Sequence, residues 1–190
     1  MPVAPPAIIG AIVPSLFSAA IVGQDVPKYA SGVASGLVQW VPLVKVSTTD
    51  TGSAGVGSNV PLPVTVVQPV LYANLITGMT SQGLVGPFMP LFCLGLANGL
   101  VASFAQMLVK TTHPSVGTGG GVARFNAPPA ALSVIRGFTS VGMIGPSAVQ
   151  KATALGIALD RTFASLVLPV VIVGSASPVG AAGVGFGNIV

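Results

Sequence analysis

Gly86-Pro87-Phe88-Met89-Pro90, followed by the apolar residues 91–109, is the stretch that decides the fold, because the chain contains it three times. Its counterparts are Gly23-Gln24-Asp25-Val26-Pro27 before residues 28–40 and Gly145-Pro146-Ser147-Ala148-Val149 before residues 150–166. A pattern that returns at a period of about 60 residues indicates a repeat architecture. We therefore predict one body, 1–190, made of repeats at about residues 5–63, 64–124 and 125–190.

Upstream of this stretch, each repeat opens with a proline and continues as a mostly apolar segment with helical spacing. In the first repeat Pro14 falls inside the segment and predicts a kinked or shorter helix. Glycine ends helices readily because it adopts the left-handed conformation, and proline fits the first turn of the next helix. Asp25 is expected to cap the second helix of the first repeat. The predicted helix-junction residues are Gly23, Gly86, Gly145, Pro87 and Pro146.

The second helix of each repeat is predicted at about residues 26–40, 87–108 and 146–166. Small residues spaced four apart lie beside its large apolar ones, and such spacing lets another helix approach closely. Glycine inside a helix costs roughly 0.5–1 kcal/mol relative to alanine, so close packing must offset it. Tyr29 and Trp40 are interpreted as packing residues. The predicted helix-packing interface consists of Gly32, Gly36, Gly95, Gly99, Ala154 and Ala158.

Downstream of the second helix, β-branched segments predict short strands or extended arms at residues 41–49, 108–112 and 166–173. Glycine-rich phrases follow in all three repeats and predict loops. The predicted fold class is mainly α with short β arms (α+β), built from three tandem helix–Gly/Pro–helix–strand–Gly-loop repeats.

Charged residues are scarce. The 190 residues include 7 Lys+Arg and 3 Asp+Glu, which is 5% of the chain, and the mean hydropathy is +0.89. Ordinary soluble domains carry roughly 25% charged residues. Most of the surface is therefore expected to be covered by lipid or by other protein subunits. The net charge of +4 does not indicate nucleic-acid binding, because the cations are scattered and form no patch.

No motif predicts catalysis, a cofactor or a metal. The glycines of residues 52–57 lack the preceding strand and following helix of a phosphate-binding loop. Asp50, His113 and Ser177 occupy equivalent positions in loops, and Cys93 lies in an apolar helical pattern. One histidine without clustered acids is too few for a metal site. We expect a protein that is not an enzyme, with no catalytic, cofactor-binding or metal-binding residue.

The phrase Thr48-Thr49-Asp50-Thr51-Gly52, continued by Gly55-Val56-Gly57, and the hydrophobic, charge-poor texture resemble small structural proteins of tailed-bacteriophage (myovirus-like) virions. The resemblance implies a structural subunit of the virion, assembled in the host cytoplasm, with tail or baseplate favoured over capsid. It implies homo- and hetero-oligomeric contacts with other structural subunits and no catalytic residue.

The alternative is an integral membrane protein with Gly-x-x-x-Gly helix packing. Residues 84–109 carry no charge and exceed the roughly 20 residues needed to span a bilayer. The other two copies of this helix are interrupted by charged residues, and all three copies should share one environment. We therefore favour the protein assembly over the membrane. The interrupting residues are Lys28, Lys151, Asp160 and Arg161.

Overall fold

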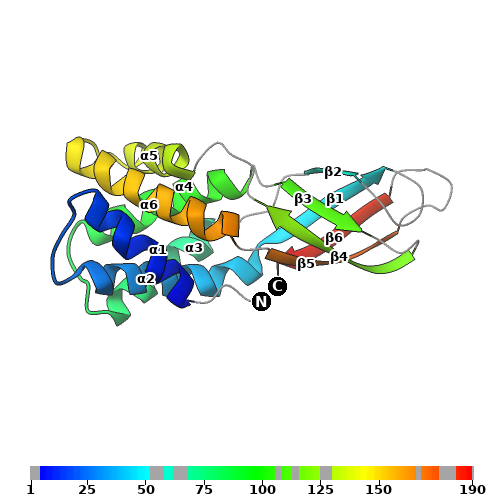
Figure 1. Cartoon of the computed structure of the whole chain (residues 1–190), viewed down its shortest axis with the longest axis horizontal. Helices are drawn as coiled ribbons and strands as arrows, with labels where there is room; N and C mark the ends of the chain where they lie inside the picture. The colour runs from blue at the N-terminus through cyan, green and yellow to red at the C-terminus, as the bar shows by residue number, and fades with distance from the viewer. Residues whose placement is uncertain are drawn as a thin grey trace.

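The structure is a computed structural model, and the part of the chain that it describes falls into helices and strands. It describes residues 5–51, 58–61, 68–105, 108–112, 116–124, 130–165, 168–175 and 183–189. Side chains are described for residues 5–44, 68–105 and 131–162. The helices form one end of an elongated molecule and the strands form the other (Figure 1).

The described residues form two α-helices in each repeat. The first helices are α1 (Pro5–Ser18), α3 (Gln68–Ser81) and α5 (Ala130–Ser140). The second helices are α2 (Val26–Trp40), α4 (Met89–Phe104) and α6 (Pro146–Ser165). A short 3-10 helix, η1 (Val41–Leu43), follows α2. Pro14 lies inside α1, which nevertheless continues to Ser18.

The helices close into a ring in chain order. Each helix packs against its two neighbours in sequence, and α6 packs back against α1. Consequently the second helix of each repeat contacts the first helix of the next repeat, and the third repeat contacts the first in the same way. The arrangement is a six-helix ring with approximate three-fold symmetry generated within one chain.

Equivalent apolar residues of the three repeats fill the ring. Val33, Leu96 and Leu155 occupy one position of the second helices, and none is exposed to solvent. Equivalent residues one turn later on the second helices, and at two positions of the first helices, are also buried. These further buried positions are Leu37, Leu100 and Leu159, then Ile12, Leu75 and Val134, and then Leu16, Met79 and Phe138.

The strands also follow the repeats. Each repeat supplies one antiparallel pair: β1 (Lys45–Thr51) with β2 (Ser58–Pro61), β3 (Leu108–Thr112) with β4 (Val116–Arg124), and β5 (Leu168–Ser175) with β6 (Gly183–Ile189). Antiparallel ladders between β4 and β5 and between β6 and β1 join the pairs. The strand order is β2-β1-β6-β5-β4-β3, and the two edge strands, β2 and β3, approach each other.

The predicted α+β fold with short β arms is wrong. Of the residues whose side chains are described, 81% are helical and none lies in a strand, so this body is all-α. The extended segments do not leave it as separate arms, because their backbones pair in a six-stranded sheet. Extended backbone needs partners for its N–H and C=O groups, and six such segments at one end of a ring supply them to each other.

The predicted glycine-rich loops are partly strands. In the second repeat, the glycines of residues 117–121 belong to β4, and in the third repeat Gly183, Gly185 and Gly187 belong to β6. The corresponding phrase of the first repeat, residues 52–57, lies outside the described residues. Glycine is depleted in strands as a rule, so composition favoured a loop, whereas pairing with neighbouring strands holds these glycines extended.

Candidate functional site

Four of the small residues predicted to form helix contacts lie where one repeat meets the next. A Cβ atom added to Gly36 of α2 would lie 2.9 Å from the Cα of Leu75 on α3, and Gly32 lies against Gly78 and Met79. A Cβ atom added to Gly99 of α4 would lie 2.5 Å from the Cα of Val134 on α5. The equivalent of Gly78 on α5 is Gly137, which faces Gly95 and Gly99. The backbones of these helix pairs therefore approach too closely for a side chain.

The third contact, between α6 and α1, is built differently. Ala154 and Ala158 are buried on α6, and Ser15 of α1 stands where the other repeats have Gly78 and Gly137. The Ser15 hydroxyl is buried without a hydrogen-bond partner among the described residues. Ala154, Ala158 and Ser15 carry side chains where the other repeats have glycine, so the two helices cannot approach as closely. A pocket of about 320 Å³ lies between them, with Arg161 in its lining.

The first helix of each repeat ends five residues before the junction glycine, and the residue that caps it lies three residues before that glycine. Ala20, Gly83 and Gly142 have φ angles of 57°, 73° and 79°, in the left-handed region. The next residue then donates its N–H to the carbonyl five residues earlier, which is the Schellman arrangement. The three bonds are Ile21 to Leu16 (2.9 Å), Leu84 to Met79 (3.1 Å) and Met143 to Phe138 (3.0 Å).

The predicted junction residues lie in the connection that follows this cap. Gly23 and Gly145 have positive φ angles of 152° and 108°, and Gly86 precedes α4 by three residues. Pro146 is the first residue of α6, whereas Pro87 lies before α4, whose first turn contains Pro90 instead.

Asp25 occupies the N-cap position of α2, but its carboxylate does not cap the helix. The side chain makes no capping hydrogen bond, so the expected role of this residue is wrong. Instead its carboxylate accepts a hydrogen bond from the Lys28 ammonium at 3.0 Å. Both side chains are more than half exposed, and such an ion pair contributes little to stability.

The three connections between first and second helices lie at the end of the helical body that faces away from the sheet (Figure 1). They carry exposed apolar side chains. Val22, Val85 and Ile144 each precede a junction glycine, and their side chains are 74%, 78% and 77% exposed. Phe88 in the middle connection is 72% exposed. We call these four residues the tip.

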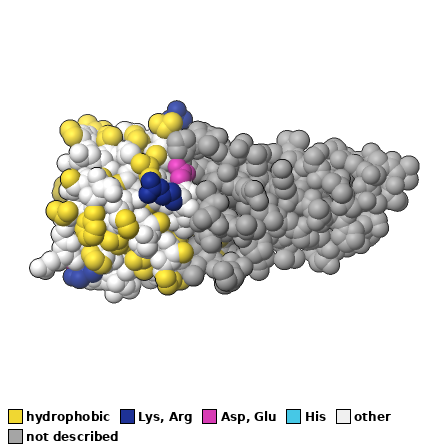
Figure 2. All heavy atoms as spheres, viewed as in Figure 1, with side chains coloured by type: hydrophobic (Ala, Val, Ile, Leu, Met, Phe, Trp, Pro, Cys, Tyr) yellow, Lys and Arg dark blue, Asp and Glu magenta, His cyan; other side chains and the backbone are white. Residues whose placement is uncertain are grey.

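Beyond the tip, the helical surface is also poor in charge. Figure 2 shows hydrophobic side chains spread over the visible face of this body, with few charged side chains among them. Large exposed hydrophobic residues outside the tip are Phe17, Leu43, Leu91, Leu132, Val149 and Ile157. The three tip aliphatic residues are the most exposed of the large hydrophobic residues described.

A pocket of about 310 Å³ opens beside the tip and is lined from all three repeats. One position of the second helices contributes three different side chains: Tyr29 of α2, Phe92 of α4 and Lys151 of α6. The Tyr29 and Phe92 rings pack at a centroid distance of 4.8 Å. The remaining lining is mostly apolar and includes Met79, Leu84, Met89 and Met143. We call this the axial pocket.

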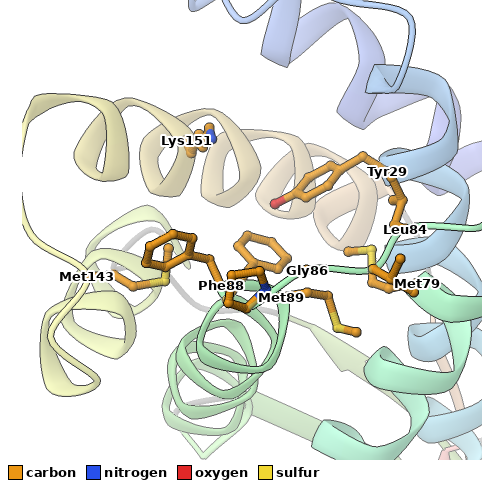
Figure 3. Close-up of a pocket in the computed structure, with 11 residues that line it drawn as sticks. Tyr29, Met79, Leu84, Gly86, Phe88, Met89, Met143 and Lys151 are labelled. Atoms are coloured by element: carbon orange, nitrogen blue, oxygen red, sulfur yellow. The ribbon is translucent and has the colours of Figure 1, made fainter.

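The hydroxyl of Tyr29 is the buried polar group at the axial pocket. Figure 3 shows Tyr29 extending from α2 with its hydroxyl directed toward the space between α6 and residues Phe88 and Met89. Its oxygen is buried and has no hydrogen-bond partner among the described residues. Leaving such a group unpaired costs about 1–3 kcal/mol. Burial, followed by the nearby Cys93 thiol, raises the pKa of Tyr29 well above its usual value of 10.0, so the hydroxyl keeps its proton.

Cys93 is a buried cysteine close to Tyr29 and Met89. Its side chain is fully buried, and its Sγ lies 3.7 Å from the Sδ of Met89. Burial raises the pKa of the Cys93 thiol from 9.0 to about 12, so thiolate is scarce at neutral pH. The equivalent residues of the other repeats are Ala30 and Ala152, which are also buried. Cys93 thus fills a small apolar position.

The acidic residues and the histidine do not form a metal site in the described part of the chain. Within the described residues, no three His, Cys, Asp or Glu side chains are close enough to hold a metal ion. Asp50 lies in β1, where its backbone faces Asn59 of β2, and its side chain is outside the described part. His113 and Ser177 lie outside the described residues altogether.

No family model, curated protein or solved structure matches the chain. Among the helices described, none is both long enough and apolar enough to cross a membrane.

The tip and the axial pocket were missed by the sequence reasoning. Aligning the repeats on their junction glycines would have shown a large aliphatic residue immediately before each one. The same alignment places Tyr29, Phe92 and Lys151 at one position. Neither alignment indicates exposure or a cavity, because both depend on how the ring closes.

Proposed function

We propose that this chain is a non-enzymatic structural subunit of a large protein assembly, and that it binds neighbouring subunits through its tip. A bacteriophage virion is the assembly that we propose, with a tail or baseplate location favoured over the capsid. The single observation that carries the proposal is the similarly high exposure of Val22, Val85 and Ile144, at 74%, 78% and 77%. Val85 and Phe88 of the tip line one pocket, and contiguous exposed apolar patches on soluble proteins commonly mark interaction sites.

The symmetry of the helical ring supports the same role. Three equivalent side chains around one end of the ring match a partner with three equivalent contact points. A chain that generates three-fold symmetry internally fits a three-fold or six-fold axis without needing three copies of itself. Scarce charge supports burial in an assembly, since 5% charged residues provide little solvated surface.

The test is incorporation into native particles. In the triple variant Val22→Ser/Val85→Ser/Ile144→Ser, we expect the amount of chain in purified particles to fall by about tenfold or more. Burial of one aliphatic side chain is worth roughly 1.5–3 kcal/mol, so losing three weakens the contact strongly. Quantitative mass spectrometry of the particles measures the incorporation, and circular dichroism checks that the variant folds.

A matched control replaces three exposed apolar residues away from the tip, in the variant Leu43→Ser/Leu132→Ser/Ile157→Ser. These side chains are 54%, 49% and 39% exposed, and we expect normal incorporation of this variant. Absence of the wild-type chain from purified particles would overturn the assembly role. Equal incorporation of the tip variant and the wild type would overturn the role of the tip.

A further inference from the structure

The axial pocket combines a soft apolar lining with unsatisfied polar groups. Three of the five methionines of the chain line it: Met79, Met89 and Met143. Methionine is flexible and polarizable, so it adapts to an irregular apolar ligand better than branched side chains do. At about 310 Å³ the pocket lies at the lower end of the range for small-molecule sites. It therefore fits a slender ligand better than a bulky one.

The polar groups of the pocket indicate which polar group the ligand carries at one end. The buried Tyr29 hydroxyl has no partner among the described residues and remains a hydrogen-bond donor at neutral pH. Lys151 lines the same pocket and forms no ion pair within the described part of the chain. No Asp or Glu lies in the lining, and the only acid described near this end of α2, Asp25, is paired with Lys28.

A neutral donor and an unpaired cation together favour an anionic acceptor. Hydrogen bonds in which one partner is charged are shorter and stronger than neutral ones, so a carboxylate satisfies Tyr29 better than an alcohol does. Attraction to Lys151 adds to this preference, although the exposed ammonium makes it sensitive to salt.

We propose that the axial pocket binds one unbranched aliphatic chain that ends in a carboxylate, as in a medium-chain fatty acid. The alkyl chain packs on the three methionines and Phe92. The carboxylate accepts a hydrogen bond from Tyr29 and lies near Lys151. Val85 and Phe88 belong both to the tip and to the lining of this pocket. Decanoate binding is nevertheless measured without a partner protein, so its failure and the failure of the proposed assembly role are distinguishable.

The experiment titrates the full chain with sodium decanoate in a calorimeter, below the concentration at which decanoate forms micelles. We expect saturable binding of one decanoate per chain. The variant Tyr29→Phe should weaken it about tenfold or more, because it removes a hydrogen bond to a charged group. The variant Lys151→Gln should weaken it about threefold and flatten its salt dependence.

Matched controls are available in the chain. Tyr72→Phe changes the other tyrosine and Lys28→Gln changes a lysine outside the lining, and both should bind decanoate as the wild type does. Carbon-13 labelling of methionine methyl groups gives a second readout, in which the Met79, Met89 and Met143 resonances should shift with decanoate.

A comparison of decanoate, decanol and phospholipid vesicles tests whether the pocket recognises a free carboxylate on an alkyl chain. Decanol should bind more weakly than decanoate and be insensitive to Lys151→Gln. Vesicles of phosphatidylcholine alone should not shift the resonances of Met79, Met89 and Met143, because an esterified chain has no free carboxylate. The proposal is overturned if decanoate does not saturate, if decanol binds as tightly, if these vesicles shift the three resonances as decanoate does, or if Tyr29→Phe binds decanoate unchanged.

Discussion

Ala20 has the left-handed backbone conformation that glycine adopts at the same place in the other two repeats. Its φ angle is 57°, against 73° for Gly83 and 79° for Gly142. The left-handed region costs a residue with a Cβ atom roughly 1–2 kcal/mol, whereas glycine enters it freely. The hydrogen bond from the Ile21 N–H to the Leu16 carbonyl, at 2.9 Å, holds Ala20 there. The first repeat therefore carries local strain that the other two avoid.

This strain predicts opposite effects for two reciprocal substitutions. Ala20→Gly should raise the free energy of unfolding by up to about 1 kcal/mol, because relief of strain exceeds the extra entropy of glycine in the unfolded chain. Gly142→Ala should lower it by about 1 kcal/mol for the same reason. Urea unfolding followed by circular dichroism measures both. Equal stability of Ala20→Gly and the wild type would contradict the strain.

At the scale of elements, the contact between α4 and α5 depends on the absence of side chains. A Cβ atom on Gly99 would lie 2.5 Å from the Cα of Val134 and 2.7 Å from the carbonyl oxygen of Ser133. Both neighbours are backbone atoms, so they cannot turn aside as a flexible side chain would. Asn98 adds a polar link across three helices, because it accepts a hydrogen bond from Gln68 of α3 and donates one to Ser140 of α5, both at 3.1 Å.

Gly99→Ala should therefore destabilise the protein. Overpacking costs typically 1–3 kcal/mol, which exceeds the roughly 0.5–1 kcal/mol that alanine gains over glycine in a helix, so we expect a net loss of about 1–2 kcal/mol. The control is Gly10→Ala in α1, where an added Cβ atom meets nothing within 4 Å. That variant should be stabilised by roughly 0.5–1 kcal/mol. If both variants shift the urea midpoint in the same direction, the close contact between Gly99 and the backbone of α5 is contradicted.

At the scale of the whole molecule, each repeat completes its core only with its neighbours. The second helix of every repeat packs against the first helix of the next, and α6 returns to α1. Ladders also join strands of different repeats, between β4 and β5 and between β6 and β1. A single repeat separated from the others exposes both of the faces that meet its neighbours.

A peptide of residues 64–124, the second repeat alone, should consequently not fold. Without α2 and α5, the glycine faces of α3 and α4 have no partner, and an isolated helix of this length is marginal in water. Far-ultraviolet circular dichroism should show little helix and no cooperative thermal transition, whereas the full chain should melt cooperatively. A sharp melting transition of the peptide would show that the repeat is an independent unit.

Much of the helical pattern could be predicted from particular residues. The repeated prolines and glycines located the helix pairs to within a few residues, since Pro146 begins α6 and Trp40 ends α2. The helix ends were placed less well. The cap is at Ala20, Gly83 and Gly142 rather than at the junction glycines, because a Schellman cap depends on hydrogen bonds that spacing alone does not specify.

The sequence by itself determined the repeat period, the helix pairs and the glycine positions where helices can approach closely. These features follow from local backbone preferences and from spacing along one helix. Only the tertiary structure decided that the strands pair in one sheet, that α6 closes on α1, and that Tyr29, Phe92 and Lys151 line one pocket. Each of these joins residues far apart in the chain. Their meeting depends on how three similar units pack around a common axis, and that packing is a property of all three together.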